Sequence, residues 1–183
     1  GMTPTKLLDK ISSGETIQYS FTIIEGWTTA QLINFVSRDK NLLHVLKGLS
    51  DKQVMAKLGM SDLHPEGQFL PDTYNFPKGS TDLEFLKRAH IALVVFLDEQ
   101  WQKKAPKLPY KKPYDALIMA SIIEKETGAA HERPQISGVF VRRLQKRMRL
   151  QTDPTVIYGM GKAYKGNIRR RHLRQDTPYN TYT

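Results

Sequence analysis

The chain contains no cysteine and no long apolar run, and these two absences narrow what it can be. Without cysteine it forms no disulfide and uses no thiolate for catalysis or metal binding. The apolar stretch at residues 91–97 is far shorter than the ~20 residues needed to cross a bilayer, so we expect the chain as given to be soluble. Gly1 before Met2 resembles the remnant of a removed tag, which is compatible with a targeting or anchoring segment upstream.

Two kinds of catalytic site are disfavoured by the spacing of their residues. The histidines show no HExxH or comparable ligand spacing, so we expect no metal site and no cofactor. No GxSxG motif is present, and Ser121 falls inside a predicted helix, so a Ser-His-Asp triad has no support either. The five histidines are His44, His64, His90, His131 and His172.

Acidic residues are in deficit, with 18 Asp and Glu against 28 Lys and Arg, which gives a net charge of +10. Such a balance favours polyanionic partners such as nucleic acid, anionic lipid or an acidic wall polymer. The basic region carries no zinc-ligand spacing, aromatic ribonucleoprotein motif or P-loop, so nucleic acid is not an expected partner. The basic residues of the last third are Arg142, Arg143, Lys146, Arg147, Arg149, Arg169, Arg170, Arg171 and Arg174.

The chain is 183 residues long and 39% hydrophobic, enough to bury one core, or one core and a small satellite domain. A short helix is predicted from Thr3-Pro4 to Ser13-Gly14, and residues 17–23 alternate apolar and polar side chains as a half-buried strand does. Gly, Pro and Asp are frequent in residues 59–80, which predicts an ordered loop. We therefore expect two domains, 1–61 and 62–183. Capping boxes that predict helix starts are Thr28 with Gln31, Ser50 with Gln53, and Thr81 with Glu84.

The larger domain is predicted to be mainly helical. A long helix runs to about Trp101 and is expected to form the spine of this domain. Pro134 suits the first turn of another helix, and Asp153-Pro154 starts a short element that glycines soon end. Residues from 166 onward are predicted to be irregular. The fold class is therefore α+β, with a small strand and helix domain before a mainly helical one.

Residues 114–128 combine an apolar run with two carboxylates near its end, Glu124 and Glu126. Asp115 is suited to cap the first turn of a helix there, and Gly128 is suited to a left-handed C-terminal cap. The segment therefore predicts one uninterrupted helix.

The two glutamates differ in their phase on this helix. At about 100° per residue, Glu126 falls within about 60° of Met119, Ile122 and Ile123, whereas Glu124 falls on the opposite side. A carboxyl that faces apolar groups resists ionisation, as a general acid near neutral pH requires. Glu126 is therefore the first candidate for catalysis, although an ion pair with one of the many cations is the ordinary alternative.

Side chains that bind sugar hydroxyls and amides are available elsewhere in the sequence. Gln151, Asn180, Tyr158 and Tyr179 are of this type. Three of them also have a structural explanation: Tyr158 as a residue at the core edge, Asn180 as a turn former, and Gln151 as a surface amide. The residues alone leave these alternatives open.

Long motifs add a resemblance to a known family. The segments ASIIEKET at 120–127, VFVRRL at 139–144, MRLQTDPTVIYG at 148–159 and YNTYT at 179–183 closely resemble the MltG (YceG-like) family of endolytic murein transglycosylases. Residues 66–74 match that family's EGxxxPDTY-like element as well. The similarity covers essentially the whole chain.

The resemblance implies a bacterial, single-pass inner-membrane enzyme whose catalytic part faces the periplasm. It would cut glycan strands of peptidoglycan between N-acetylmuramic acid and N-acetylglucosamine and leave 1,6-anhydromuramic ends. The second glutamate of the EKET motif is the family's catalytic acid, and it falls on Glu126. Peptidoglycan synthases are possible partners, and the region before Asp62 resembles the family's small LysM-like region.

By the same resemblance, substrate-binding positions fall on Gln151, Asp153, Tyr158, Asn180, Glu66 and Tyr74. The family normally carries an N-terminal transmembrane helix and continues beyond YNTYT, so we expect this chain to lack the anchor and to hold an incomplete catalytic domain. The alternative to an enzyme is therefore a peptidoglycan-binding module that is inactive because it is truncated.

Overall fold

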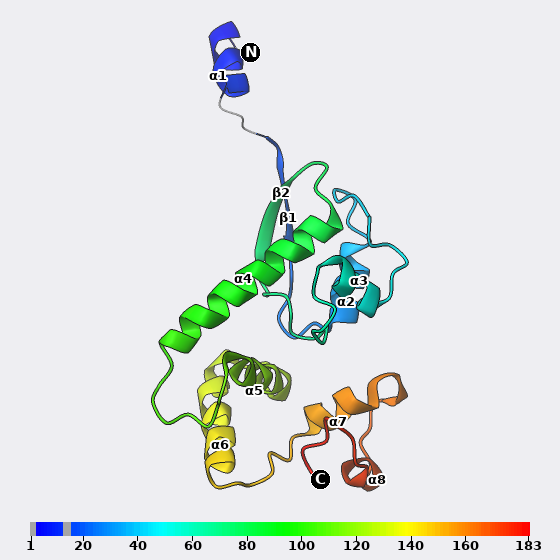
Figure 1. The fold of residues 1–183 in the computed structure, drawn as a ribbon, viewed down its shortest axis with the longest axis vertical. Coiled ribbons are helices and arrows are strands. Elements are labelled where there is room, and N and C mark those ends of the chain that lie inside the picture. Colours follow the sequence, from blue (N-terminus) through cyan, green and yellow to red (C-terminus); the bar gives the residue numbers. More distant parts are fainter. Residues whose placement is uncertain (1–2, 13–15) are drawn as a thin grey trace. The chain divides into compact units, whose positions relative to one another are not determined.

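The computed structural model describes residues 3–12 and 16–183, which form two compact units, residues 1–93 and residues 94–183 (Figure 1). The helices and the small sheet agree with the α+β prediction. The compact units divide later than the predicted boundary at 61/62, because residues 69–93 supply side chains to the first core. The predicted helix stop at Ser13-Gly14 lies outside the described residues.

The first unit contains helices α1 (Pro4–Ser12), α2 (Thr29–Val36) and α3 (Asp51–Lys57), strands β1 (Gln18–Thr22) and β2 (Thr73–Pro77), and the first part of α4 (Asp82–Gln102). The strands pair antiparallel. Tyr19 lies opposite Phe76, and Phe21 opposite Tyr74. β2 lies inside the stretch predicted as loop, and its alternate residues Tyr74 and Phe76 are buried.

Helix starts in this unit follow the predicted capping boxes. The Thr28 backbone N–H donates to Gln31 Oε1 at 2.9 Å, while the Gln31 N–H donates to Thr28 Oγ1 at 3.2 Å. The same reciprocal pattern satisfies N–H groups that the first helical turn leaves without partners. The other two confirmed boxes are Ser50 with Gln53 and Thr81 with Glu84.

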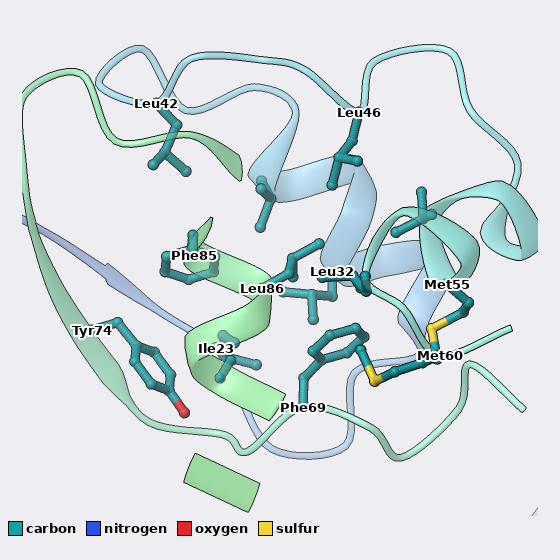
Figure 2. Close-up of a cluster of buried hydrophobic side chains, with 14 of the residues drawn as sticks. Ile23, Leu32, Leu42, Leu46, Met55, Met60, Phe69, Tyr74, Phe85 and Leu86 are labelled. Carbon is teal, nitrogen blue, oxygen red and sulfur yellow. The ribbon is translucent and has the colours of Figure 1, made fainter. Parts of the chain in front are cut away.

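One hydrophobic core holds the first unit together (Figure 2). Phe85 and Leu86 of α4 are 1% and 0% exposed, and they meet Leu32 of α2 and Phe76 of β2 in the same cluster. Burying each such side chain contributes about 1.5–3 kcal/mol. The long helix α4, expected as the spine of the larger domain, therefore gives its first half to this core.

The second unit contains the end of α4 and then α5 (Pro113–Glu126), η1 (Ala130–Glu132), α6 (Arg133–Gln145), α7 (Asp153–Met160), η2 (Gly161–Ala163) and α8 (Arg170–Arg174). Its buried apolar residues are few, namely Met119, Phe140 and Val156 in the described part of the chain. The tail predicted as irregular thus contains the short helix α8. No helix in the described part of the chain is long and apolar enough to cross a membrane.

Candidate active site around Glu126

Glu126 is the last residue of α5, so the helix sets where its carboxyl projects. Pro113 begins the helix, and the Asp115 carboxylate accepts hydrogen bonds from the N–H groups of Lys111 and Lys112 at 2.9 and 3.1 Å. The next residue, Thr127, is extended at φ −142°, ψ 139°, so the helix ends at Glu126. The predicted left-handed cap at Gly128 is wrong, because Gly128 does not have a positive φ.

The Glu126 side chain is exposed, and its Oε2 accepts a 2.6 Å hydrogen bond from Oγ1 of Thr152. Helical phase predicted apolar surroundings for this carboxyl, and the exposure contradicts that expectation. On the same helix Met119 is buried, but Ile122 and Ile123 are only half-buried. A helix end projects beyond the packed face, so phase alone does not determine burial.

Glu124 has a different environment from Glu126. Its Oε2 lies 2.9 Å from Nη2 of Arg133, the first residue of α6, and the Glu124 side chain is 26% exposed. This ion pair links α5 to the first residue of α6. The ordinary ion-pair explanation therefore applies to Glu124, while Glu126 contacts a hydroxyl.

Thr152, which contacts Glu126, is itself joined to two other threonines, Thr155 and Thr181. Thr152 is 2% exposed, and its backbone N–H donates to Thr181 Oγ1 at 3.0 Å. Thr155 Oγ1 donates to the Thr152 carbonyl oxygen at 2.7 Å and lies 3.0 Å from Thr181 Oγ1. These contacts fasten the start of α7 to the C-terminal segment, which Figure 1 shows running beside α7.

Asp153 and Tyr182 form a further pair next to these threonines. We call these five residues the wall beside Glu126: Thr152, Asp153, Thr155, Thr181 and Tyr182. The Tyr182 hydroxyl donates to Asp153 Oδ1 at 2.6 Å. Burial, this hydrogen bond and the negative charges of Asp153 and Glu126 raise the pKa of Tyr182 to about 12, while the Arg143 cation acts in the opposite direction. Tyr182 therefore stays protonated and remains a donor beside two carboxylates.

Gln151 occupies a left-handed backbone conformation, with φ of 53°, immediately before Thr152. Its N–H donates to the Thr181 carbonyl at 3.1 Å, and its side-chain Oε1 accepts from Arg143 at 3.3 Å. Arg143 Nη1 also donates to the carbonyl of Leu150 at 2.7 Å. The unusual backbone is thus held by contacts on both sides.

Asn180 shapes the C-terminal turn. It is 9% exposed, its Nδ2 donates to the Gln175 carbonyl at 2.7 Å, and its Oδ1 accepts from the Tyr182 N–H at 2.9 Å. The turn-forming explanation therefore applies to it. Tyr158 and Tyr179 lie edge to face, with ring centroids 4.8 Å apart, and both are partly exposed.

Two predicted substrate-binding residues, Glu66 and Tyr74, belong to the first unit. Glu66 Oε1 accepts from the Thr29 N–H at 2.6 Å, at the start of α2. Tyr74 is 9% exposed, and its hydroxyl donates to the Leu70 carbonyl at 2.8 Å. Both contacts stabilise the fold of that unit.

The second unit therefore presents one exposed glutamate held by a buried hydroxyl, with a tyrosine-carboxylate pair beside it. The same unit also carries two exposed aromatic rings that pack on each other. Such a set of groups suits proton transfer to a polar, ring-shaped ligand such as a sugar. Within residues 3–12 and 16–183, no three His, Cys, Asp or Glu side chains are grouped to hold a metal ion. Analysis of the residues alone missed Thr152, Thr181 and Tyr182, although all three lie in the quoted motifs.

The charge of the chain is segregated between the units. Residues 94–183 carry 18 of the 28 Lys and Arg but only 8 of the 18 Asp and Glu, so the whole net charge of +10 falls in the second unit. Residues 1–93 balance ten cations with ten anions. The wall beside Glu126 thus belongs to the basic unit.

Comparison with known proteins gives consistent results. A family model described as the YceG-like family matches residues 1–183. An endolytic murein transglycosylase of Bacillus subtilis is 32% identical over 206 aligned positions, covering all of this chain and 55% of the relative. One from Streptococcus pneumoniae is 29% identical over 122 residues, which are 64% of this chain and 22% of the relative.

A solved structure is similar as well. The crystal structure of a putative YceG-like protein from Listeria monocytogenes has a TM-score of 0.65 and 31% identity, with 97% of this chain and 63% of the other chain covered. The chain thus spans about half the length of the Bacillus relative and under two thirds of this crystal structure.

Proposed function

The chain belongs to the YceG-like family, and on that premise we propose that it is the murein-cleaving part of an endolytic lytic transglycosylase. The observation that carries the proposal is the exposed Glu126 carboxyl at the end of α5, held by the buried Thr152 hydroxyl at 2.6 Å. The relatives named endolytic murein transglycosylase support the same assignment.

The proposed reaction breaks the bond between N-acetylmuramic acid and N-acetylglucosamine within a glycan strand. Glu126 donates its proton to the glycosidic oxygen, which leaves with the bonding electrons as the hydroxyl of the departing sugar. The resulting Glu126 carboxylate then takes the proton of the muramoyl C6 hydroxyl. The C6 oxygen attacks C1 and closes the 1,6-anhydro ring, so Glu126 ends the cycle protonated.

One carboxyl suffices in this scheme because the substrate supplies its own nucleophile. Hydrolytic glycosidases place two carboxyl groups about 5–5.5 Å or roughly 6.5–9.5 Å apart, since one must act as nucleophile or base. Here the C6 hydroxyl replaces water. Glu124, engaged with Arg133, is then a structural residue.

The remaining expectations are proposals of the same kind. Gln151, Asp153, Tyr158 and Asn180 would position the glycan near Glu126. Glu66 and Tyr74 would act from the first unit, and residues 1–61 would form a LysM-like glycan-contacting region. In the cell, the protein would face the periplasm from the inner membrane, with peptidoglycan synthases as partners.

Digestion of purified peptidoglycan sacculi tests the proposal, with the Bacillus subtilis relative as a positive control. Mass spectrometry should detect anhydro-ended fragments from this chain, Glu126→Gln should abolish them, and Glu124→Gln should retain them. Activity lost in Glu124→Gln but kept in Glu126→Gln would refute the assignment. Sedimentation with sacculi without any product would instead support a glycan-binding module.

A further inference from the structure

We propose that Thr152 is a positioning residue that determines which oxygen of Glu126 delivers and recovers the proton. This inference rests on the proposed function, because it gives a task to the neighbour of the proposed acid. Thr152 is 2% exposed, whereas Glu126, whose carboxyl it contacts, is an exposed residue. Thr152 directly precedes α7 and is 26 residues from Glu126 in the sequence. Its buried hydroxyl therefore holds one oxygen of the Glu126 carboxyl at 2.6 Å.

The hydrogen bonds around Thr152 fix the direction of its hydroxyl. Each threonine hydroxyl has a single hydrogen to donate. Thr155 uses its hydrogen on the Thr152 carbonyl at 2.7 Å, which leaves Thr181 as the donor in the 3.0 Å contact between their hydroxyls, with the Thr152 carbonyl oxygen at 3.5 Å as a second acceptor for Thr181. Thr181 in turn accepts the Thr152 N–H at 3.0 Å. The ring is complete without the Thr152 hydroxyl hydrogen, which is directed to Glu126.

This direction has a chemical consequence for the carboxyl. A protonated carboxyl oxygen is a poorer acceptor than an unprotonated one, so a donor fixed at Oε2 favours the acid proton on Oε1. Oε1 then gives the proton to the glycosidic oxygen and recovers one from the C6 hydroxyl. Glu126 need not rotate between the two proton transfers, which keeps both within one bound geometry.

The anchoring of Thr152 shows why it suits this task. Its backbone is held on the N–H side by Thr181 and on the carbonyl side by Thr155, and its side chain is buried. A donor that is itself fixed loses little freedom when it binds a carboxylate, and so it orients the carboxylate before substrate arrives. Glu126, at a helix end and exposed, depends on such a contact for its orientation.

Thr152→Val and Thr152→Ser test the inference. Valine has a similar shape without the hydroxyl, so kcat should fall about 10- to 100-fold while KM changes less than about 3-fold. Serine keeps the hydroxyl and should restore kcat to within about 3-fold of the parent. Ser121→Ala removes an exposed hydroxyl on α5, the helix that carries Glu126, and should leave both constants unchanged. A folded Thr152→Val variant with at least half of the parent kcat would overturn the inference.

Two further measurements keep the test decisive. If Thr152→Val does not fold, Thr152→Cys offers similar volume with only a weak S–H donor, and it should show the same loss of kcat. If the parent chain yields no anhydro product, the proposed function fails, and the contact is tested through unfolding. Thr152→Val should then change the unfolding equilibrium constant roughly 3- to 10-fold less in a Glu126→Ala background. An equal change in the unfolding equilibrium constant in the parent and in the Glu126→Ala background would exclude a stabilising contact between Thr152 and Glu126.

Discussion

The phenol hydroxyl of Tyr182 donates a 2.6 Å hydrogen bond to Oδ1 of Asp153, although 29 residues separate them in the chain. Asp153 begins α7, so this contact ties the C-terminal segment to the element that follows Thr152. Arg149 adds a second tie, because its Nη1 donates to the Tyr182 carbonyl at 2.7 Å. The end of the chain is thereby part of the wall beside Glu126.

Tyr182→Phe should lower the free energy of unfolding by about 1 kcal/mol, because it removes one partly exposed hydrogen bond and keeps the ring. Urea titration measures this difference. Tyr164→Phe is the matched control, since the Tyr164 hydroxyl has no hydrogen bond within the described residues, and it should change stability by less than about 0.5 kcal/mol. Equal effects of the two variants would show that the Asp153 contact does not stabilise the fold.

Two roles of Gln151, its left-handed backbone and the proposed glycan contact of its side chain, can be tested separately by substitution. Its φ of 53° lies in the left-handed region, so Gln151→Val should cost about 1–2 kcal/mol, whereas Gln151→Gly should cost well under 1 kcal/mol. Thermal unfolding measures both. If the side-chain amide also positions glycan, Gln151→Gly should raise KM in the sacculus assay without loss of folded protein. An unchanged KM would restrict Gln151 to its backbone role.

The core of the first unit should be sensitive to truncation at α4. Leu86→Ala should destabilise the protein by about 2–5 kcal/mol, because Leu86 is 0% exposed and the change leaves a cavity. Val94→Ala, on the same helix at 53% exposure, should cost less than about 0.5 kcal/mol. Denaturant unfolding followed by tryptophan fluorescence compares the two. Similar losses would mean that α4 is not anchored where the core places it.

Stability should fall at alkaline pH through Tyr74. Burial and the charge of Asp72 raise the pKa of Tyr74 from its ordinary value of 10.0 to about 12, with Arg88 acting in the opposite direction. Between these values the folded state retains a proton that the unfolded state has lost. The contribution of the Tyr74 proton to the free energy of unfolding is therefore complete below pH 10 and is lost progressively toward pH 12.

Tyr74→Phe removes this titration, so its stability should decline less than that of the parent over the same pH range. Urea midpoints measured at several alkaline pH values give the two slopes. The variant should also lose about 1 kcal/mol at neutral pH, because the hydroxyl no longer donates to the Leu70 carbonyl. Identical slopes would exclude Tyr74 as the titrating group.

Local patterns in the sequence predicted local structure well. The capping boxes, such as Thr81 with Glu84, depend on residues three apart, and the structure confirms them. β2 was missed because its neighbourhood is rich in Gly and Pro, while its pairing with β1 depends on residues about fifty positions away. The alternation of Tyr74 and Phe76 was the available indication, but it spans only a few residues.

In the candidate site, too, local features followed from the sequence and long-range contacts did not. The helix that carries Glu126 follows from periodicity, but the exposure of its carboxyl depends on what packs around the helix end. Local sequence patterns did not indicate Thr152 or Thr181, because threonine is common and their contacts join residues 26 and 29 positions apart. The catalytic role of Glu126 stays a prediction, as do the substrate-binding positions.

The backbone contacts between residues 151–152 and Thr181 make two amide protons reporters of the C-terminal segment. The N–H of Gln151 donates to the Thr181 carbonyl, and that of Thr152 donates to the Thr181 hydroxyl. Both amides should therefore exchange slowly with deuterium only while the C-terminal segment is docked. Two resonances thus measure how often the wall beside Glu126 opens, independently of any substrate.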